Sequence, residues 1–311
     1  MLKEIHKTKF GTIYCGDSLL ALKKNKLSQY INKINLIFTS PPFPLVKEKE
    51  YGNLKGQEYI NWIVEFGHHW KKLLTDDGSL IIEIGNAWED KLPCMSTVTM
   101  EALIALKQEC GFYLCQEFIV HNPSRLPSPV KWVNTDRIRL KDSYTRVWWL
   151  SKSPYPKADN RKILKKYSLG MERLLKTGKF NAGNRPSGFN ISETGFLKNN
   201  GGSISSSVIS EFDDDYLLES AMSISNTNIE KNYRTFCKDN NLPIHPARMN
   251  GKIVDVFLEF LTDQGDLVFD PFGGSCITGH RSEELNRRWI TVELDQRYAE
   301  GSVGRFNVKE K

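Results

Sequence analysis

Cysteine is scarce in this sequence, and no Cys-x-x-Cys pair occurs. Six cysteines stand at irregular spacings in 311 residues, namely Cys15, Cys94, Cys110, Cys115, Cys237 and Cys276. This pattern does not support a disulfide framework and gives little support to a zinc site. His68 and His69 are adjacent on an expected helix and point in different directions, which argues against a metal role. We therefore expect mostly buried thiols in a reducing compartment and no metal.

Long apolar runs are also absent. Mean hydropathy is −0.43, and no run approaches the ~20 apolar residues of a membrane span. The first ten residues, MLKEIHKTKF, lack the apolar segment of a secretory signal. We expect a cytoplasmic protein without membrane contact. With 311 residues, 40% of them hydrophobic, the chain can form one large domain or one domain with a smaller insertion.

Acidic residues are sparse in one long stretch. Residues 121–188 contain sixteen Lys/Arg and four Asp/Glu, a local net charge of +12 within a chain of net charge +6. The rest of the chain must therefore sum to about −6. Such asymmetry indicates a face built for a polyanion, with a solvated cationic surface as the alternative.

Candidate strands and helices alternate along most of the chain, which favours an α/β fold with a mostly parallel sheet. Strands are expected at 11–15, 35–39, 79–85, 112–120, 146–151, 266–270 and 287–294, and helices at 17–24, 57–74, 96–109, 252–262, 277–286 and 295–306. Asp17 is placed to cap the first helix. The second should stop at Asp76-Asp77-Gly78. Residues 152–244 are rich in Lys, Ser, Asn and Gly, which predicts an irregular subdomain or insertion.

A strand ending in Asp270 is followed by a glycine-rich turn, PFGGS, and a helix. Gly273 and Gly274 allow the backbone to approach a ligand closely. About twenty residues later a strand ends in Glu293, whose carboxylate can accept both ribose hydroxyl protons. The turn lacks the spacing of a dinucleotide fingerprint and the Gly-Lys-Ser/Thr of a phosphate loop. S-adenosylmethionine, a nucleoside without phosphate, fits better; the alternative is a structural strand–turn–helix.

The sequence TSPPF at 39–43 directly follows the apolar run INLIF. Consecutive prolines end a strand and hold the Pro41 carbonyl rigid, because Pro42 restricts its rotation. The Ser40 hydroxyl and the Pro41 carbonyl can accept hydrogen bonds from both protons of a nucleobase amine, and Phe43 can stack on the base. A base in a duplex must flip out to reach such a pocket. The alternative is a rigid surface turn.

Together these motifs resemble the amino-group DNA methyltransferases of the permuted beta class, in which the catalytic motif precedes the cofactor motif. TSPPF is similar to the catalytic motif and DPFGGSCITG (270–279) to the cofactor motif. GDSLLAL (16–22) and HPAR (245–248) resemble further cofactor segments. Similarity to the PvuII-type cytosine-N4 methylases extends through residues 49–53, 122–134, 185–188 and 200–204.

The resemblance implies a Rossmann-like S-adenosylmethionine-dependent methyltransferase sheet with an inserted irregular target-recognition region. The implied divisions are 1–151 and 245–311 for the catalytic and cofactor-binding parts, and 152–244 for target recognition. The implied catalytic residues are Ser40, Pro41, Pro42 and Phe43. The implied cofactor site comprises Asp17 near the adenine, Glu293 on the ribose, and His245, Asp270, Pro271, Phe272, Gly273, Gly274 and Ser275. Cys276 and Ile277 depart from the usual Gly and Thr, and we expect local repacking there.

Serine before Pro-Pro points to cytosine N4, because adenine-N6 enzymes of this family usually carry Asp or Asn there. No cysteine near 39–43 could attack as cytosine-C5 methylation requires. Double-stranded DNA is the implied partner. Its contacts are expected at Arg125, Lys131, Arg137, Arg139 and Arg185. Methylation of adenine, of RNA or of a protein amide, and an inert DNA-binding methylase fold, stay open, as do a cognate restriction endonuclease without a stable complex and a monomeric or homodimeric state.

Overall fold

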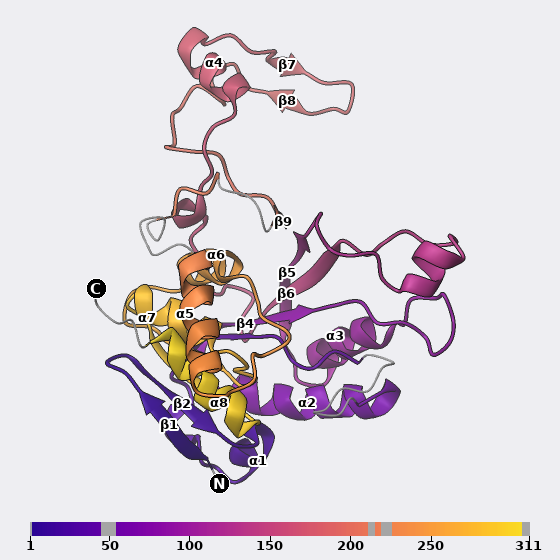
Figure 1. Cartoon of the computed structure of the whole chain (residues 1–311). Coiled ribbons are helices and arrows are strands. Elements are labelled where there is room, and N and C mark those ends of the chain that lie inside the picture. The colour runs from indigo at the N-terminus through magenta and orange to yellow at the C-terminus, as the bar shows by residue number, and fades with distance from the viewer. Residues whose placement is uncertain (1, 45–53, 211–214, 219–225, 307–311) are drawn as a thin grey trace.

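The computed structural model describes residues 2–44, 54–210, 215–218 and 226–306 (Figure 1). The motif residues 49–53 lie outside these ranges. The described chain forms a sheet of nine strands in the order β1-β2-β11-β10-β3-β4-β6-β5-β9. Their bounds are β1 Lys3–Lys7, β2 Gly11–Cys15, β3 Ile34–Thr39, β4 Leu74–Ile84, β5 Tyr113–His121, β6 Tyr144–Ser151, β9 Val208–Ser210, β10 Leu267–Asp270 and β11 Arg288–Glu293.

Five adjacent strands, β2, β11, β10, β3 and β4, run parallel to one another. This confirms the expected α/β fold with a mostly parallel sheet. β6 is antiparallel to β4, and β5 is antiparallel to β6. Buried apolar residues fill the central strands, as expected where helices cover both faces of a sheet.

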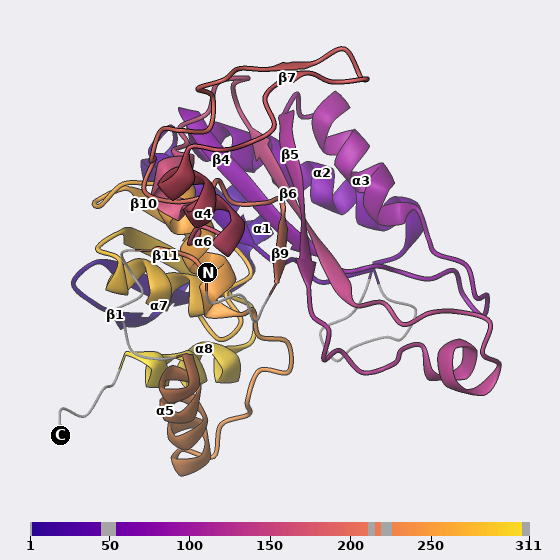
Figure 2. The same ribbon diagram turned by 90° about the horizontal axis from the view of Figure 1, so that it is seen from above.

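Helices cover the two faces of the sheet and separate the core into two clusters (Figure 2). One face is covered by α1 (Ser18–Lys23), α2 (Gly56–Leu73) and α3 (Val98–Gln108). The other is covered by α6 (Gly251–Leu261), α7 (Ile277–Glu284) and α8 (Gln296–Ser302). On α2, the residues Tyr59, Ile63, Phe66 and Trp70 recur at helical spacing and are all buried, so one apolar stripe explains its packing.

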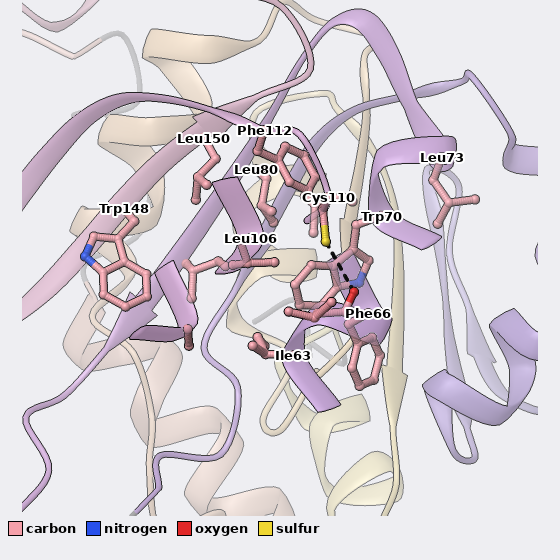
Figure 3. Packing of buried hydrophobic residues seen from close by; sticks show 14 of the residues in the cluster. Ile63, Phe66, Trp70, Leu73, Leu80, Leu106, Cys110, Phe112, Trp148 and Leu150 are labelled. Atoms are coloured by element: carbon pink, nitrogen blue, oxygen red, sulfur yellow. Dashed lines mark hydrogen bonds between the residues drawn. The ribbon is translucent and has the colours of Figure 1, made fainter. Parts of the chain in front are cut away.

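Figure 3 shows the first cluster, in which Trp70 and Phe66 of α2 lie beside Cys110 and Phe112. The Cys110 thiol donates a hydrogen bond to the Val64 carbonyl at 3.3 Å. Burial raises the pKa of Cys110 to about 11, so this sulfur is a packed thiol. Cys110, Cys237 and Cys276 are buried, whereas Cys94 is exposed. The expectation of mostly buried thiols therefore describes three of the six cysteines.

The expected strands and helices outside 152–244 are found, with ends that shift by a few residues. The largest difference is at Asp76-Asp77-Gly78, where the helix expected at 57–74 was predicted to stop, whereas α2 ends at Leu73. Residues 76–78 lie inside β4, because Leu74 already pairs with Ile34 and Ser79 with Leu36. Residues 75–78 therefore form a bulge opposite Asn35.

Within its described residues, the region expected to be irregular contains two α-helices, α4 (Leu169–Thr177) and α5 (Asn226–Asp239). α4 and the hairpin of β7 (Gly183–Asn184) and β8 (Asn190–Ile191) extend away from the body of the molecule (Figure 1). α5 instead packs on the body: a Cβ added at Gly304 would lie 2.5 Å from Phe236. No helix in the described residues is long and apolar enough to cross a membrane.

Each loop between strands lies at one of two edges of the sheet, and each edge is formed by the ends of the strands. β3, β4, β10 and β11 all end at the same edge. Because β5 and β6 pair antiparallel, with His121 opposite Tyr144 and Arg146 opposite Ile84, the loop between them lies at this edge too. The chain leaves β6 at the opposite edge, where the Lys157 amide donates to the Asp77 carbonyl at 2.9 Å.

Candidate active site at the carboxyl ends of the parallel strands

The Ser40 loop leaves the sheet at the end of β3, where a parallel sheet commonly binds its ligands. Pro41 is buried, and Ser40 and Phe43 are half-buried. The Phe43 ring packs against the backbone after β4, since a Cβ added at Gly85 would lie 2.6 Å from it. The loop is thus fixed at both ends, by β3 and by the Phe43–Gly85 contact.

A side-chain hydrogen bond joins this loop to the glycine-rich turn. Thr39 Oγ1 donates to Asp270 Oδ1 at 2.8 Å, and the Phe272 amide donates to the same oxygen at 3.1 Å. Asp270 is buried, and this burial raises its pKa to about 6. The two motifs, 231 residues apart in sequence, therefore share one hydrogen-bonded junction.

The turn at 271–275 is anchored on both sides. Phe272 packs edge-on against Phe66 of α2 at 5.0 Å between ring centroids. A Cβ added at Gly273 would lie 2.1 Å from the Thr291 hydroxyl, so only glycine fits against β11. Gly274 has φ +51°, and an added Cβ would lie 3.1 Å from the His245 ring. Both glycines expected to shape the turn are thus needed where they stand.

Glu293 and His245 lie on either side of Gly274. The Glu293 carboxylate accepts from the Gly274 amide at 2.6 Å and from the Asp295 amide at 2.9 Å. Burial raises the pKa of Glu293. The His245 Nδ1–H donates to the Ala247 carbonyl at 2.6 Å, and its ring packs edge-on against Tyr298 at 4.7 Å. Each Glu293 oxygen, with one backbone hydrogen bond, keeps acceptor capacity for a ligand hydroxyl.

Asp17 begins α1 at the same edge. Its carboxylate accepts from the Leu20 amide at 2.9 Å, which confirms the predicted helix cap. The adjacent Gly16 amide donates to the Glu293 carbonyl at 2.8 Å, so the segment is tied to the end of β11.

Cys276, the residue directly before α7, has a left-handed backbone with φ +55°, as Gly274 does two residues earlier. Glycine adopts this conformation without steric cost, which explains why it is common here in the similar family. The side chain is buried, and a Cβ added at Gly279 would lie 2.6 Å from its sulfur. The cysteine side chain therefore fills the space beside Gly279.

Two residues that the sequence did not single out, Arg305 and Glu230, support the turn from behind together with Arg248 of the HPAR segment. Arg305, wholly buried, donates to the Ser275 carbonyl and to Ser275 Oγ, the latter at 2.9 Å. Glu230 of α5 accepts from Arg305 at 2.8 Å and from Arg248 at 2.9 Å. Arg248 also donates to the His245 carbonyl at 2.6 Å. One carboxylate therefore connects the turn to the His245 segment.

Comparison with known proteins agrees with this arrangement. A family model described as DNA methylase matches residues 34–303. This chain belongs to the DNA methylase family. The type II methyltransferase M.PvuII of Proteus hauseri is 38% identical over 98% of this chain and 86% of its own length. M.HpaI of Haemophilus parainfluenzae is 23% identical over 95% of this chain and 74% of its own.

A solved structure described as PvuII DNA methyltransferase (cytosine-N4-specific) matches this methylase with a TM-score of 0.72 and 32% identity. The match covers 99% of this chain and 90% of that one. The M1.HpyAVI–SAM complex, at 16% identity and TM-score 0.50, shares the fold.

The basic residues of this methylase fall into two groups. Arg125, Lys131, Arg137 and Arg139 lie in the loop between β5 and β6, at the edge that carries Ser40 and Asp270. Arg185 lies beside β7, on the part that extends away from the body (Figure 1). Arg125 and Arg139 are half-buried, and both donate to backbone carbonyls, those of Tyr144 and Pro93. The structure thus places four of the five predicted DNA residues in a loop at the same edge of the sheet as the candidate site, and Arg185 elsewhere.

Proposed function

We propose that this DNA methylase transfers a methyl group from S-adenosylmethionine to the N4 amine of a cytosine flipped out of duplex DNA. The observation that carries this proposal is the junction of Thr39 with Asp270, which holds the Ser-Pro-Pro-Phe loop beside the glycine-rich turn. The 32% identity to the solved structure described as PvuII DNA methyltransferase (cytosine-N4-specific) supports the choice of cytosine.

For the cofactor, we propose that Asp270, Pro271, Phe272, Gly273, Gly274 and Ser275 form the wall of the binding site. Glu293 would accept hydrogen bonds from the ribose hydroxyls, since it stands at the strand end with spare acceptor capacity. Asp17 would lie near the adenine, and His245 over Gly274. The Gly273 and Gly274 amides are used within the protein, by the Val292 carbonyl and the Glu293 carboxylate. The turn at 271–275 contains no lysine and lies beside a carboxylate, which fits a nucleoside lacking phosphates. When bound, the cofactor supplies an electrophilic methyl group on a sulfonium.

For the target base, we propose that Ser40 Oγ and the Pro41 carbonyl accept hydrogen bonds from the two amine protons, and that Phe43 stacks on the ring. Pro42 keeps the Pro41 carbonyl in place. These acceptors favour the pyramidal amine, whose lone pair can attack. The amine nitrogen would bond to the methyl carbon as the bond between that carbon and the sulfonium sulfur breaks, which leaves a neutral thioether. The amine proton, acidic only once methylation has begun, would pass to solvent, so orientation and electrostatics account for most of the rate enhancement.

We further propose that the chain between β6 and α5, within residues 152–244, recognises the DNA sequence, and that Arg185 contacts DNA there. A type II methyltransferase relative supports a further proposal, a cognate restriction endonuclease that forms no stable complex with this protein. We propose a cytoplasmic location, where genomic DNA and the cofactor would both be available.

Incubation with duplex DNA and S-adenosylmethionine labelled on the methyl group, followed by digestion to nucleosides, tests the proposal. We expect label in N4-methylcytosine. Label confined to N6-methyladenine would move the assignment to adenine, and equal activity on single-stranded RNA would favour an RNA substrate. Tight DNA binding without calorimetric cofactor binding would indicate an inert methylase fold.

A further inference from the structure

The loop of residues 122–143, called here the β5–β6 loop, combines positive charge with exposed apolar side chains. It contains five Lys/Arg and two Asp/Glu. Four apolar residues in it are exposed, namely Leu126 (81%), Val130 (61%), Ile138 (62%) and Leu140 (89%). A single exposed leucine needs no explanation, but four apolar residues on one cationic loop indicate a surface that a partner covers.

The loop reaches the catalytic segment through Trp88. The Arg139 guanidinium lies 3.7 Å above the centre of the Trp88 ring, and Trp132 packs edge-on against the same ring at 6.5 Å. Trp88 also lines a cavity of about 310 Å³ together with Pro44, the residue after Phe43. Arg139 and Trp132 of the β5–β6 loop are therefore connected through Trp88 to the cavity that Pro44 lines.

Leu140 is held out from the loop by anchored neighbours. Arg139 before it stacks on Trp88 and donates to the Pro93 carbonyl. Lys141 after it donates to the Pro123 carbonyl at 2.8 Å. The backbone at 140 is thus fixed on both sides, while the Leu140 side chain is 89% exposed. A side chain presented in this way loses little further conformational freedom when it inserts into a partner.

Duplex DNA with one base flipped out offers an anionic surface and an apolar surface, which match the positive charge and the exposed apolar side chains of this loop. Its phosphates attract the exposed Lys131 and Arg137. A flipped base leaves an apolar gap in the stack, and proteins that distort DNA commonly fill such gaps with leucine, isoleucine or methionine.

We propose that the β5–β6 loop enters the duplex at the target cytosine and that Leu140 fills the space that the flipped base leaves. This proposal rests on the proposed methylation of a flipped cytosine. In it, Arg139 and Trp88 are positioning residues that hold Leu140. Lys131 and Arg137 contact phosphates on either side of the opened base pair.

The test uses the full chain and a duplex carrying the site that it methylates, found by sequencing DNA from cells that express it. Leu140→Ser should lower kcat/KM by about tenfold or more on the paired duplex. On a duplex whose target cytosine lies opposite an abasic site, where no pairing resists flipping, the loss should be less than about threefold. Leu140→Met should retain most activity. As a control, Ile31→Ser removes a 50% exposed apolar side chain just before β3, at the opposite edge. It should leave kcat/KM unchanged on both duplexes.

Equal losses for Leu140→Ser on the two duplexes, or no loss on either, would overturn the role of Leu140 in base flipping. A change of oligomeric state in the variant would instead identify a second copy of this chain as the partner of the loop. Failure of the unmodified protein to methylate any DNA would contradict the proposed function itself, so the two failures are distinguishable.

Discussion

At the scale of single residues, Ser40 carries the sharpest catalytic prediction. If its hydroxyl accepts a hydrogen bond from the target amine, Ser40→Ala should lower kcat by about 10²-fold, the range for one transition-state hydrogen bond. The cofactor Kd should change less than about twofold, since the turn and Glu293 are untouched. Single-turnover kinetics and calorimetry measure the two values. A matched loss in both would mean that Ser40 is structural.

Asp270 provides a pH-dependent prediction. Burial raises its pKa to about 6 from 3.8, so the folded state binds its proton more tightly than the unfolded chain does. Its contribution to stability is therefore present at low pH and lost as pH rises through 6. Asp270→Asn removes this titration. Relative to the unmodified protein, the variant should become more stable by about 1 kcal/mol between pH 5 and pH 7.

Urea unfolding at the two pH values measures this difference, because all other titrating groups are common to both proteins. Thr39→Val provides a second check. The Thr39 hydrogen bond favours the charged carboxylate. Its loss should raise the Asp270 pKa further, so that the loss of stability extends to higher pH. If the stability difference between Asp270→Asn and the unmodified protein is the same at pH 5 and pH 7, the Asp270 pKa lies near its ordinary value.

The residues of the glycine-rich turn could be found from the sequence, because they are consecutive and form a recognisable motif. Sequence reasoning could not find Arg305 or Glu230, whose importance arises from burial and from contacts over 75 residues of sequence. Cys276 is an intermediate case. Its departure from glycine was visible, but its left-handed backbone, which explains the usual glycine, appears only in the structure.

At the scale of elements, the parallel strands were predictable because their apolar runs are continuous. α5 and β1 were not predicted. The α5 sequence is polar, although Tyr233, Phe236 and Cys237 stand at helical spacing and could have indicated one buried stripe. β1 is a five-residue edge strand with little burial, so its sequence carries no strong pattern.

α5 should stabilise the glycine-rich turn at 271–275 through Glu230. Glu230→Gln removes the charge that pairs with Arg305, whose side chain is 0% exposed. Because loss of one partner leaves a buried charge uncompensated, the free energy of unfolding should fall by about 2 kcal/mol or more. The cofactor Kd should rise, since Arg305 holds Ser275 and Arg248 holds the His245 carbonyl.

Glu65 offers a matched control for Glu230. It pairs with Lys23 at 2.6 Å, but both side chains are more than 40% exposed. Glu65→Gln should therefore change stability by less than about 1 kcal/mol and leave the cofactor Kd unaltered. Equal effects of the two substitutions, measured by urea unfolding and calorimetry, would contradict a specific role for α5 in supporting the turn.

At the scale of the whole molecule, charge asymmetry predicts how DNA binding responds to salt. Residues 121–188 carry a net charge of +12, and their first part forms the β5–β6 loop at the edge that carries Ser40 and Asp270. Each phosphate contact releases counterions, so log Kd should vary linearly with log salt concentration. Removing one phosphate contact should lower the magnitude of that slope by about 1. We expect this for Lys131→Ala and for Arg137→Ala.

A substitution at Lys107 distinguishes the loss of a local phosphate contact from the loss of net charge. This residue is an exposed lysine in the last turn of α3, just before β5 begins at the edge opposite Ser40. Lys107→Ala removes the same charge, but it should leave the slope unchanged, because it lies away from the proposed DNA path. Fluorescence anisotropy over a range of salt concentrations measures all three variants. An equal change for Lys107→Ala would mean that net charge, and not the β5–β6 loop, determines binding, and the DNA path proposed along the catalytic edge would then be wrong.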